Sequence, residues 1–226
     1  MVESGKNIAI IPARGGSKRF PKKNLALLNN KQLIVYSIEY AKRNNAIIDA
    51  VYVSTDDSEI AKVAEDHGAI AIERPSVLSG DHEPTVTSLS HVISKIDEQV
   101  ANVILLQVTN PLRPENLLQE CFTQFQAGDF ESAMTVTRNH QKFGKITNGN
   151  FVPFNYTFGQ RSQDLDPLYF ENGLLYITKA SLISENVILG KKNLPFIVNH
   201  PFAEIDIDVE EDLIKAAFIY NNLIKK

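Results

Sequence analysis

A cation-rich loop follows the first apolar run of the chain. Residues 8–11 predict a short strand, and the turn after it contains the adjacent glycines Gly15 and Gly16. Because glycine tolerates positive φ, we expect this loop to turn its backbone N–H groups into one concavity. The loop also carries five basic side chains, which are Arg14, Lys18, Arg19, Lys22 and Lys23. N–H groups and cations together suit a polyphosphate, so the loop predicts a nucleoside triphosphate site.

Two familiar phosphate-binding motifs do not describe this loop. A Walker loop requires G-x-x-x-x-G-K-[ST] directly before a helix, whereas here Ser17 precedes Lys18 and Pro21 interrupts the chain. The G-x-G-x-x-G spacing of dinucleotide-binding proteins does not occur here either. A solvated basic turn is the alternative, because most clusters of charge only face water. The position of the loop favours a ligand, since open α/β sheets bind ligands at the carboxyl ends of their strands.

A pair of carboxylates, Asp206 and Asp208, lies near the C-terminus. Side chains two residues apart on an extended segment point to the same side. Mg²⁺ is commonly held by one or two carboxylates together with substrate phosphates, so the pair predicts a magnesium site. The alternative is that Asp208, with Glu211 three residues later, caps the last helix.

Alternating strand and helix patterns would position these groups. They predict an α/β fold with a doubly wound, mostly parallel sheet, in a single domain of residues 1–226. Asp56 and Glu59 predict a capping box for a helix that ends at Gly68. The apolar runs that predict strands in the first part of the chain are residues 8–13, 50–53, 69–72, 103–106 and 132–137.

The stretch of residues 139–172 breaks this pattern. It contains Gly, Asn, Pro and several aromatic residues but few helical signals. We expect an irregular insertion that acts as a lid over the substrate or as a subunit interface.

Composition excludes several classes of protein. The net charge of -4 argues against a nucleic-acid or membrane-surface role, because such proteins usually have a basic excess. The single cysteine, Cys121, excludes an intrachain disulfide and is expected to be a small core residue. No signal peptide or membrane-spanning run is recognisable, so we expect a cytoplasmic protein.

Taken together, the motifs resemble those of the acylneuraminate cytidylyltransferases, in the same order and over nearly the whole chain. The resemblance implies a nucleotide-diphosphosugar-transferase-like α/β fold and a homodimer formed partly through the insertion. It also implies Mg²⁺-dependent transfer of CMP from CTP to a nine-carbon 2-keto sugar acid, N-acetylneuraminate or a relative such as legionaminate, with release of pyrophosphate. The segments that carry the resemblance are residues 11–18, 21–24, 53–56, 74–75, 105–113, 171–173 and 205–208.

The resemblance implies a role for each matching residue. The expected contacts to CTP are Arg14, Lys18, Lys23, Asn24, Arg74 and Thr85. The expected catalytic groups are Arg14, Lys18, Lys23 and Asp208. The expected contacts to the sugar acid are Gln107, Arg161 and Asn172, and the expected ligands of Mg²⁺ are Asp206 and Asp208.

Two positions depart from related sequences. Related enzymes often have paired arginines before the Asn-Gly motif, but here Ser162 follows Arg161, so Arg161 alone is the expected partner of the sugar carboxylate. Enzymes that activate 3-deoxy-octulosonate carry an acidic residue where this chain has Thr109, which favours a nine-carbon acid. The alternatives are a cytidylyltransferase for another keto sugar acid such as 3-deoxy-octulosonate, a D-x-D glycosyltransferase and a non-catalytic nucleotide-binding module.

Overall fold

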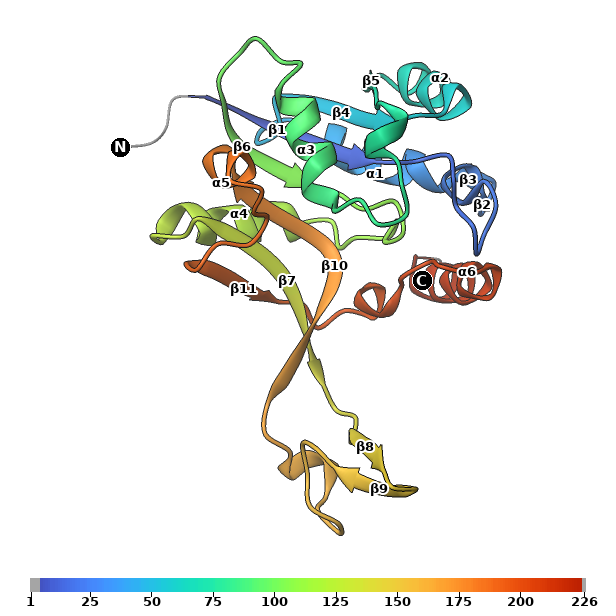
Figure 1. The fold of residues 1–226 in the computed structure, drawn as a ribbon, viewed down its shortest axis with the longest axis vertical. Helices are drawn as coiled ribbons and strands as arrows, with labels where there is room; N and C mark the ends of the chain where they lie inside the picture. The colour runs from blue at the N-terminus through green and yellow to red at the C-terminus, as the bar shows by residue number, and fades with distance from the viewer. Residues whose placement is uncertain (1–4, 225–226) are drawn as a thin grey trace.

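A seven-stranded sheet forms the centre of the computed structural model, which describes residues 5–224 (Figure 1). The strand order is β11-β7-β10-β6-β1-β4-β5, and β10 runs antiparallel to both of its neighbours while all other pairs are parallel. This confirms the expected α/β fold with a mostly parallel sheet. The strands of the sheet are β1 (Lys6–Pro12), β4 (Ala50–Thr55), β5 (Ile70–Glu73), β6 (Val100–Leu105), β7 (Ser132–Asn139), β10 (Leu168–Lys179) and β11 (Asn193–Ile197).

Helices cover both faces of this sheet. One core contains side chains of α1, α2, α4 and α6, and the core on the other face contains side chains of α3 and α5. Among the helices of residues 5–224, none combines the length and the apolar character needed to span a membrane. The helices are α1 (Leu33–Arg43), α2 (Ser58–Asp66), α3 (Thr85–Ile93), α4 (Leu117–Ala127), α5 (Ala180–Ser184) and α6 (Glu210–Ile224).

The alternation of side chains along β1 explains why its residues 8–11 are continuously apolar. Ile8 and Ile10 belong to one core, whereas Ala9 and Ile11 belong to the other. Successive side chains of a strand point to opposite faces, so a strand buried on both faces has no polar positions.

Cys121 of α4 is also buried, and burial raises the pKa of its thiol to about 12.

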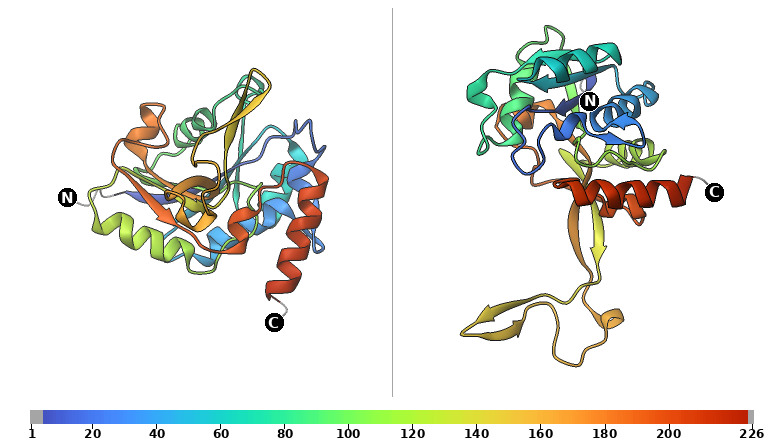
Figure 2. Two further views of the ribbon diagram at one scale, coloured as in Figure 1. Left: turned by 90° about the horizontal axis from the view of Figure 1, so that it is seen from below. Right: turned by 90° about the vertical axis from the view of Figure 1, so that its right-hand side faces the viewer.

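The expected insertion of residues 139–172 combines short strands with irregular segments such as residues 154–161. β7 and β10 continue beyond the sheet as a two-stranded ribbon, and a small hairpin of β8 (Gly144–Thr147) and β9 (Asn150–Pro153) lies at its far end. Figures 1 and 2 show this arm projecting away from the sheet and its helices. The two-stranded ribbon was not expected, because it depends on pairing between strands, as between Leu168 and Asn139, which local periodicity does not reveal.

Several short elements complete the chain. They are β2 (Leu27–Leu28), β3 (Lys31–Gln32) and the 3-10 helices η1 (Lys23–Leu25), η2 (Ser76–Leu78), η3 (Ser162–Asp164) and η4 (Pro201–Glu204).

Candidate active site

Two cavities open among the loops that follow the strands of the sheet. The larger, of about 590 Å³, is lined by Gln107 after β6, by parts of β7 and β10, and by the segment around Asp206. The smaller, of about 250 Å³, is lined by Arg14 after β1, by Arg74 after β5 and by Thr85 at the start of α3. Of the predicted site residues, Arg14, Arg74 and Gln107 therefore lie at the carboxyl edge of the parallel strands, where open α/β sheets bind ligands.

The loop after β1 is held in place by two polar contacts. The N–H of Gly15 donates to Oδ1 of Asp56 (2.9 Å), and Nδ2 of Asn24 donates to the backbone oxygen of Arg14 (2.8 Å). Asn24 is buried, so its amide fixes the loop from the protein side.

The glycines of this loop have a different role from the one expected. Positive φ occurs at Lys22 (52°), not at Gly15 or Gly16. Gly15 is instead required by close packing, because a Cβ atom there would lie 2.7 Å from Oδ2 of Asp57. The expectation of a left-handed glycine turn was therefore wrong, and steric contact with the loop after β4 explains this glycine.

The helix cap expected at Asp56 is shifted by one residue. Oδ1 of Asp57 accepts hydrogen bonds from the N–H groups of Glu59 (2.8 Å) and Ile60 (3.1 Å). Asp56 is therefore available to bind Gly15, so one aspartate caps α2 and its neighbour anchors the loop after β1.

Two predicted cations converge on a carboxylate that the sequence did not single out. Nη1 of Arg14 lies 2.9 Å from Oδ1 of Asp81, and Nζ of Lys18 pairs with the other oxygen. The hydrogen bond from Lys18 lowers the pKa of Asp81 below its usual range. Asp81 thus occupies the position between two cations that an anionic ligand would take. The pairing depends on how two loops meet, and no local pattern reports it.

Arg74 is fixed on the wall of the smaller cavity. Its Nε and Nη2 donate to the hydroxyl (3.0 Å) and backbone oxygen (2.6 Å) of Ser54. The guanidinium is buried, which lowers its pKa, and it has no carboxylate partner among the ion pairs of the described residues. Thr85 lies exposed at the first position of α3 and borders the same cavity.

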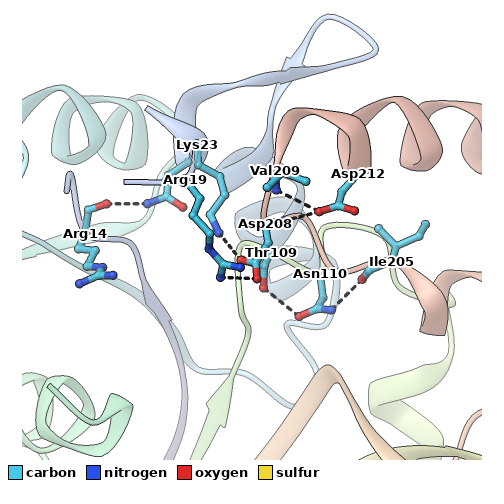
Figure 3. Close-up of polar contacts among 10 residues, drawn as sticks. Arg14, Arg19, Lys23, Thr109, Asn110, Ile205, Asp208, Val209 and Asp212 are labelled. Carbon is cyan, nitrogen blue, oxygen red and sulfur yellow. Dashed lines mark hydrogen bonds and ion pairs between the residues drawn. The ribbon is translucent and has the colours of Figure 1, made fainter. Parts of the chain in front are cut away.

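Asp208 joins the cation loop to the C-terminal segment. Nη2 of Arg19 lies 2.6 Å from one of its oxygens and Nζ of Lys23 lies 3.0 Å from the other (Figure 3). Burial alone would raise the pKa of Asp208, but the hydrogen bonds and charges of Lys23 and Arg19 outweigh burial, so its pKa lies below the ordinary value. Asp208 is therefore ionised at every pH near neutrality.

The side chains of Asp206 and Asp208 are both at least partly exposed, and that of Asp206 borders the larger cavity. Ile205 and Ile207 are buried, whereas Asp206 is exposed on the larger cavity and Asp208 is partly exposed. Within residues 5–224, no group of three or more acidic, His or Cys side chains could hold a metal alone. The pair fits Mg²⁺, because this ion needs only one or two carboxylates when phosphates supply further oxygens.

The first turn of α6 is capped by a residue other than the one considered. Oδ2 of Asp212 accepts from the N–H groups of Asp208 (2.9 Å) and Val209 (3.0 Å) (Figure 3). The alternative cap by Asp208 and Glu211 is therefore wrong, and the Asp208 carboxylate is not used by the helix.

Asn110 positions the segments on both sides of the larger cavity. Its buried Nδ2 donates to the backbone oxygens of Ile205 (2.8 Å) and Asn172 (3.1 Å). The N–H of Ile207 donates to the oxygen of Thr109 (2.8 Å), which fixes the same segment again. The end of β6 thus determines where Asp206 and Asp208 lie. No motif singled out Asn110 in the sequence, although the Asn-Pro pair shortly after the apolar run of residues 103–106 was an available signal.

Replacing Gly173 by alanine should therefore disturb the site as well as the fold. Gly173 has φ of 73°, and a Cβ atom there would lie 2.5 Å from Oδ1 of Asn110. We expect Gly173→Ala to lower the free energy of unfolding by about 3 kcal/mol, from the left-handed backbone and the clash together. Gly149→Ala is the matched control, because φ there is 78° and nothing lies within 4 Å. Gly149→Ala should lower the free energy of unfolding by only about 1 kcal/mol, as measured by urea denaturation. An equal loss in the two variants would show that the contact with Asn110 is unimportant.

The predicted contacts to the sugar acid fall in two different places. Gln107 and Asn172 line the larger cavity. The Asn172 side chain is also engaged by the protein, since it accepts from the hydroxyl of Thr135 and donates to that of Thr137 (3.0 Å). Arg161 lies exposed in the arm, paired with Asp164 (2.7 Å), and does not line the cavity of its own chain. Extended residues span about 3.3 Å each, so the ribbon carries Arg161 away from Asn172.

Comparison with known proteins identifies the family of this chain. The family model described as Cytidylyltransferase matches residues 8–219. A pseudaminic acid cytidylyltransferase of Campylobacter jejuni is 33% identical over 228 residues, which cover 95% of this chain and 96% of the relative. An N-acylneuraminate cytidylyltransferase of Streptococcus agalactiae is 27% identical over 216 residues, which cover 92% of this chain and 52% of the relative.

Solved structures show the same fold. A CMP:2-keto-3-deoxy-manno-octonic acid synthetase in complex with CTP has a TM-score of 0.72 at 17% identity, covering 96% of this chain and 99% of the other. A 4-diphosphocytidyl-2C-methyl-D-erythritol synthase of Anaerococcus prevotii has a TM-score of 0.65 at 14% identity, covering 98% and 99%. With the family match over most of its length, this chain belongs to the acylneuraminate type of the cytidylyltransferase family and is a nucleotidyltransferase.

Proposed function

We propose that this enzyme transfers CMP from CTP to the anomeric hydroxyl of a nine-carbon 2-keto sugar acid, N-acetylneuraminate or one of its relatives, and releases pyrophosphate. The observation that carries this proposal is the contact between the cation loop and the aspartate segment. Arg14 of the loop borders the smaller cavity, Lys23 of the loop pairs with Asp208, and Asp206 borders the larger cavity. A triphosphate along the loop would reach from one cavity to the other.

CTP would bind with its nucleoside in the smaller cavity. The fixed guanidinium of Arg74 and the hydroxyl of Thr85 border this space and are suited to polar groups of the nucleotide. Arg14 and Lys18 would exchange their contacts with Asp81 for contacts with phosphate oxygens. Charge-assisted bonds to a phosphate are stronger than ion pairs between exposed side chains, so the exchange is favourable.

The chemical step would be an in-line displacement at the α-phosphorus of CTP. The anomeric oxygen forms a bond to this phosphorus and transfers its proton to solvent water, while the bond from the phosphorus to the oxygen bridging to the β-phosphate breaks. The electron pair of that bond leaves with pyrophosphate. Lys18 and Lys23 stabilise the charge of the departing group, and the two cavities hold the reacting atoms in line.

Asp206 and Asp208 would hold Mg²⁺, which when bound neutralises charge on the phosphate oxygens. Asp208 is already ionised and faces the phosphate-binding loop, so its carboxylate needs no further change in protonation to serve as a ligand.

A homodimer is part of this proposal. The arm exposes an unusual number of large apolar side chains, and monomers rarely leave such a surface in water. A second copy of the chain would cover them and would bring the arm, with Arg161, near another active site; sedimentation analysis tests this. The exposed residues are Phe143, Ile146, Phe151, Val152, Phe154, Phe158, Leu168, Tyr169 and Phe170.

Pyrophosphate release tests the proposed reaction. The purified protein is mixed with CTP, Mg²⁺ and one acid at a time from a panel of N-acetylneuraminate, legionaminate, pseudaminate and 3-deoxy-octulosonate, with ATP as the nucleotide control. We expect release with CTP and a nine-carbon acid, none with ATP, and loss of release when EDTA removes Mg²⁺. Release with 3-deoxy-octulosonate alone would contradict the proposed acceptor, and binding of CTP without any release would contradict the reaction.

A further inference from the structure

Arg138 of β7 lines the larger cavity, and its guanidinium has a hydrogen-bond donor without a partner. Its Nε atom is buried and has no hydrogen-bond partner. Nη2 reaches the backbone oxygen of Leu165 only at 3.5 Å, the outer limit for a hydrogen bond. In the part of the chain that the structure describes, Arg138 also takes part in no ion pair.

An unpaired buried donor of a charged group is costly. Leaving a buried polar group unsatisfied costs about 1–3 kcal/mol, and more for a charged group. Folded proteins retain few such groups, so each one needs an explanation. A ligand in the cavity that accepts hydrogen bonds from the guanidinium would remove the cost.

The surroundings of Arg138 indicate which ligand group this is. Three carboxylates, those of Glu171, Glu204 and Asp206, line the same cavity and would repel an anion placed beside them. The other flexible cation of the cavity, Lys215, already donates to the backbone oxygen of Glu204 (3.3 Å). The guanidinium of Arg138 is therefore the strongest uncommitted attraction for negative charge in this cavity.

We propose that Arg138 binds the carboxylate of the sugar acid and thereby selects acidic over neutral sugars. A guanidinium has a planar set of donors that matches the two oxygens of a carboxylate. This assignment rests on the proposed function, because it takes the acceptor sugar to lie in the larger cavity. It gives to Arg138 the role in its own chain that the sequence had suggested for Arg161.

The first test replaces the guanidinium and measures each substrate separately. We expect Arg138→Gln to raise the KM for the sugar acid about 10- to 100-fold, as a lost charged hydrogen bond predicts, and to leave the KM for CTP within about twofold. Arg138→Lys keeps the positive charge but lacks the planar pair of donors, so its KM for the sugar acid should lie between those of the wild type and Arg138→Gln. Arg43→Gln is the control, because Arg43 lies exposed on α1 with its carboxylate neighbour Glu39 as far as 4.0 Å away. An unchanged KM for the acid in Arg138→Gln would overturn the assignment.

The second test changes the charge of the substrate in addition to the side chain of the enzyme. The primary amide of the same sugar acid lacks the negative charge. The ratio of kcat/KM for the acid to kcat/KM for the amide should therefore be about 100 in the wild-type enzyme and less than about 5 in Arg138→Gln. If Arg138 has a purely structural role, its replacement should lower kcat/KM for the acid and for the amide equally. An unchanged ratio of the two values would contradict the proposal.

Binding without turnover separates this inference from the proposed reaction. The rise in melting temperature caused by the acid, compared with its amide, is measured for the wild-type protein, for Arg138→Gln and for Arg138→Lys. Stabilisation of the wild type by the acid alone, lost in Arg138→Gln, would support the role of Arg138 even if no pyrophosphate were released. Equal stabilisation by acid and amide would overturn it even in an active enzyme.

Discussion

Asp208→Asn should abolish turnover while the protein stays folded. The substitution keeps the size of the side chain but removes the negative charge that lies against Lys23 and Arg19 and that would bind Mg²⁺. Loss of a group that supports charge in the transition state costs about 1000-fold in kcat, and we expect at least that loss. Pyrophosphate release at saturating CTP and acid measures it.

The fold of this variant should survive because the ion pair is partly exposed. The pair with the exposed Arg19 contributes about 0–1 kcal/mol, and the introduced amide oxygen can still accept a hydrogen bond from the less exposed Lys23, so the melting temperature should change by only a few degrees. Glu211→Gln is the matched control: it removes one negative charge from the first turn of α6, and it should retain nearly full activity. Near-normal turnover of Asp208→Asn would remove the metal role of this residue.

The same carboxylate gives a pH dependence with a definite sign. Its pKa in the folded protein is lowered, so its contribution to stability is present above the unfolded pKa and is lost as the pH falls through the folded pKa. Because the ordinary pKa of aspartate is about 3.9, this loss lies in the acid range below about pH 4. A fall in activity between pH 7 and pH 6 would accordingly have another origin.

Arg14→Ala should remove most of the activity through the binding of CTP. Arg14 supplies a guanidinium to the smaller cavity, and its Asp81 contact shows that this group reaches an anion there. Loss of a charge-assisted, two-point contact to phosphate should raise the KM for CTP by about 100-fold and lower kcat as well. Calorimetric titration with CTP and steady-state kinetics measure the two effects.

Asp81→Asn is the control for this experiment. Both variants break the ion pair between Arg14 and Asp81, but only Arg14→Ala removes the cation. If Arg14 matters only through that pair, both variants should lose activity equally. If Arg14 binds phosphate, Asp81→Asn should keep or improve the affinity for CTP, because a competing anion has been removed. Retained CTP affinity in Arg14→Ala would show that the loop has another role.

Local patterns in the sequence determined the elements of this protein and the kinds of chemistry at their ends. The apolar runs predicted the strands β1 and β6, and the cations after β1 marked the loop that faces Asp208. The spacing of Asp206 and Asp208 placed both carboxylates opposite buried isoleucines. Such features depend only on the alternation of side chains along extended segments and on where strands of this sheet type end, so a single sequence contains them.

Contacts between distant loops were decided by the tertiary structure alone. Asp81 reaches Arg14, and Asn110 joins Asn172 to Ile205, because separate connections meet at one edge of the sheet. The pairing of β7 with β10 sets how far the arm extends, and it leaves Arg138 in the cavity while it carries Arg161 out of it. These arrangements depend on strand register and on packing between segments far apart in the chain, neither of which leaves a periodic signal in the residues themselves.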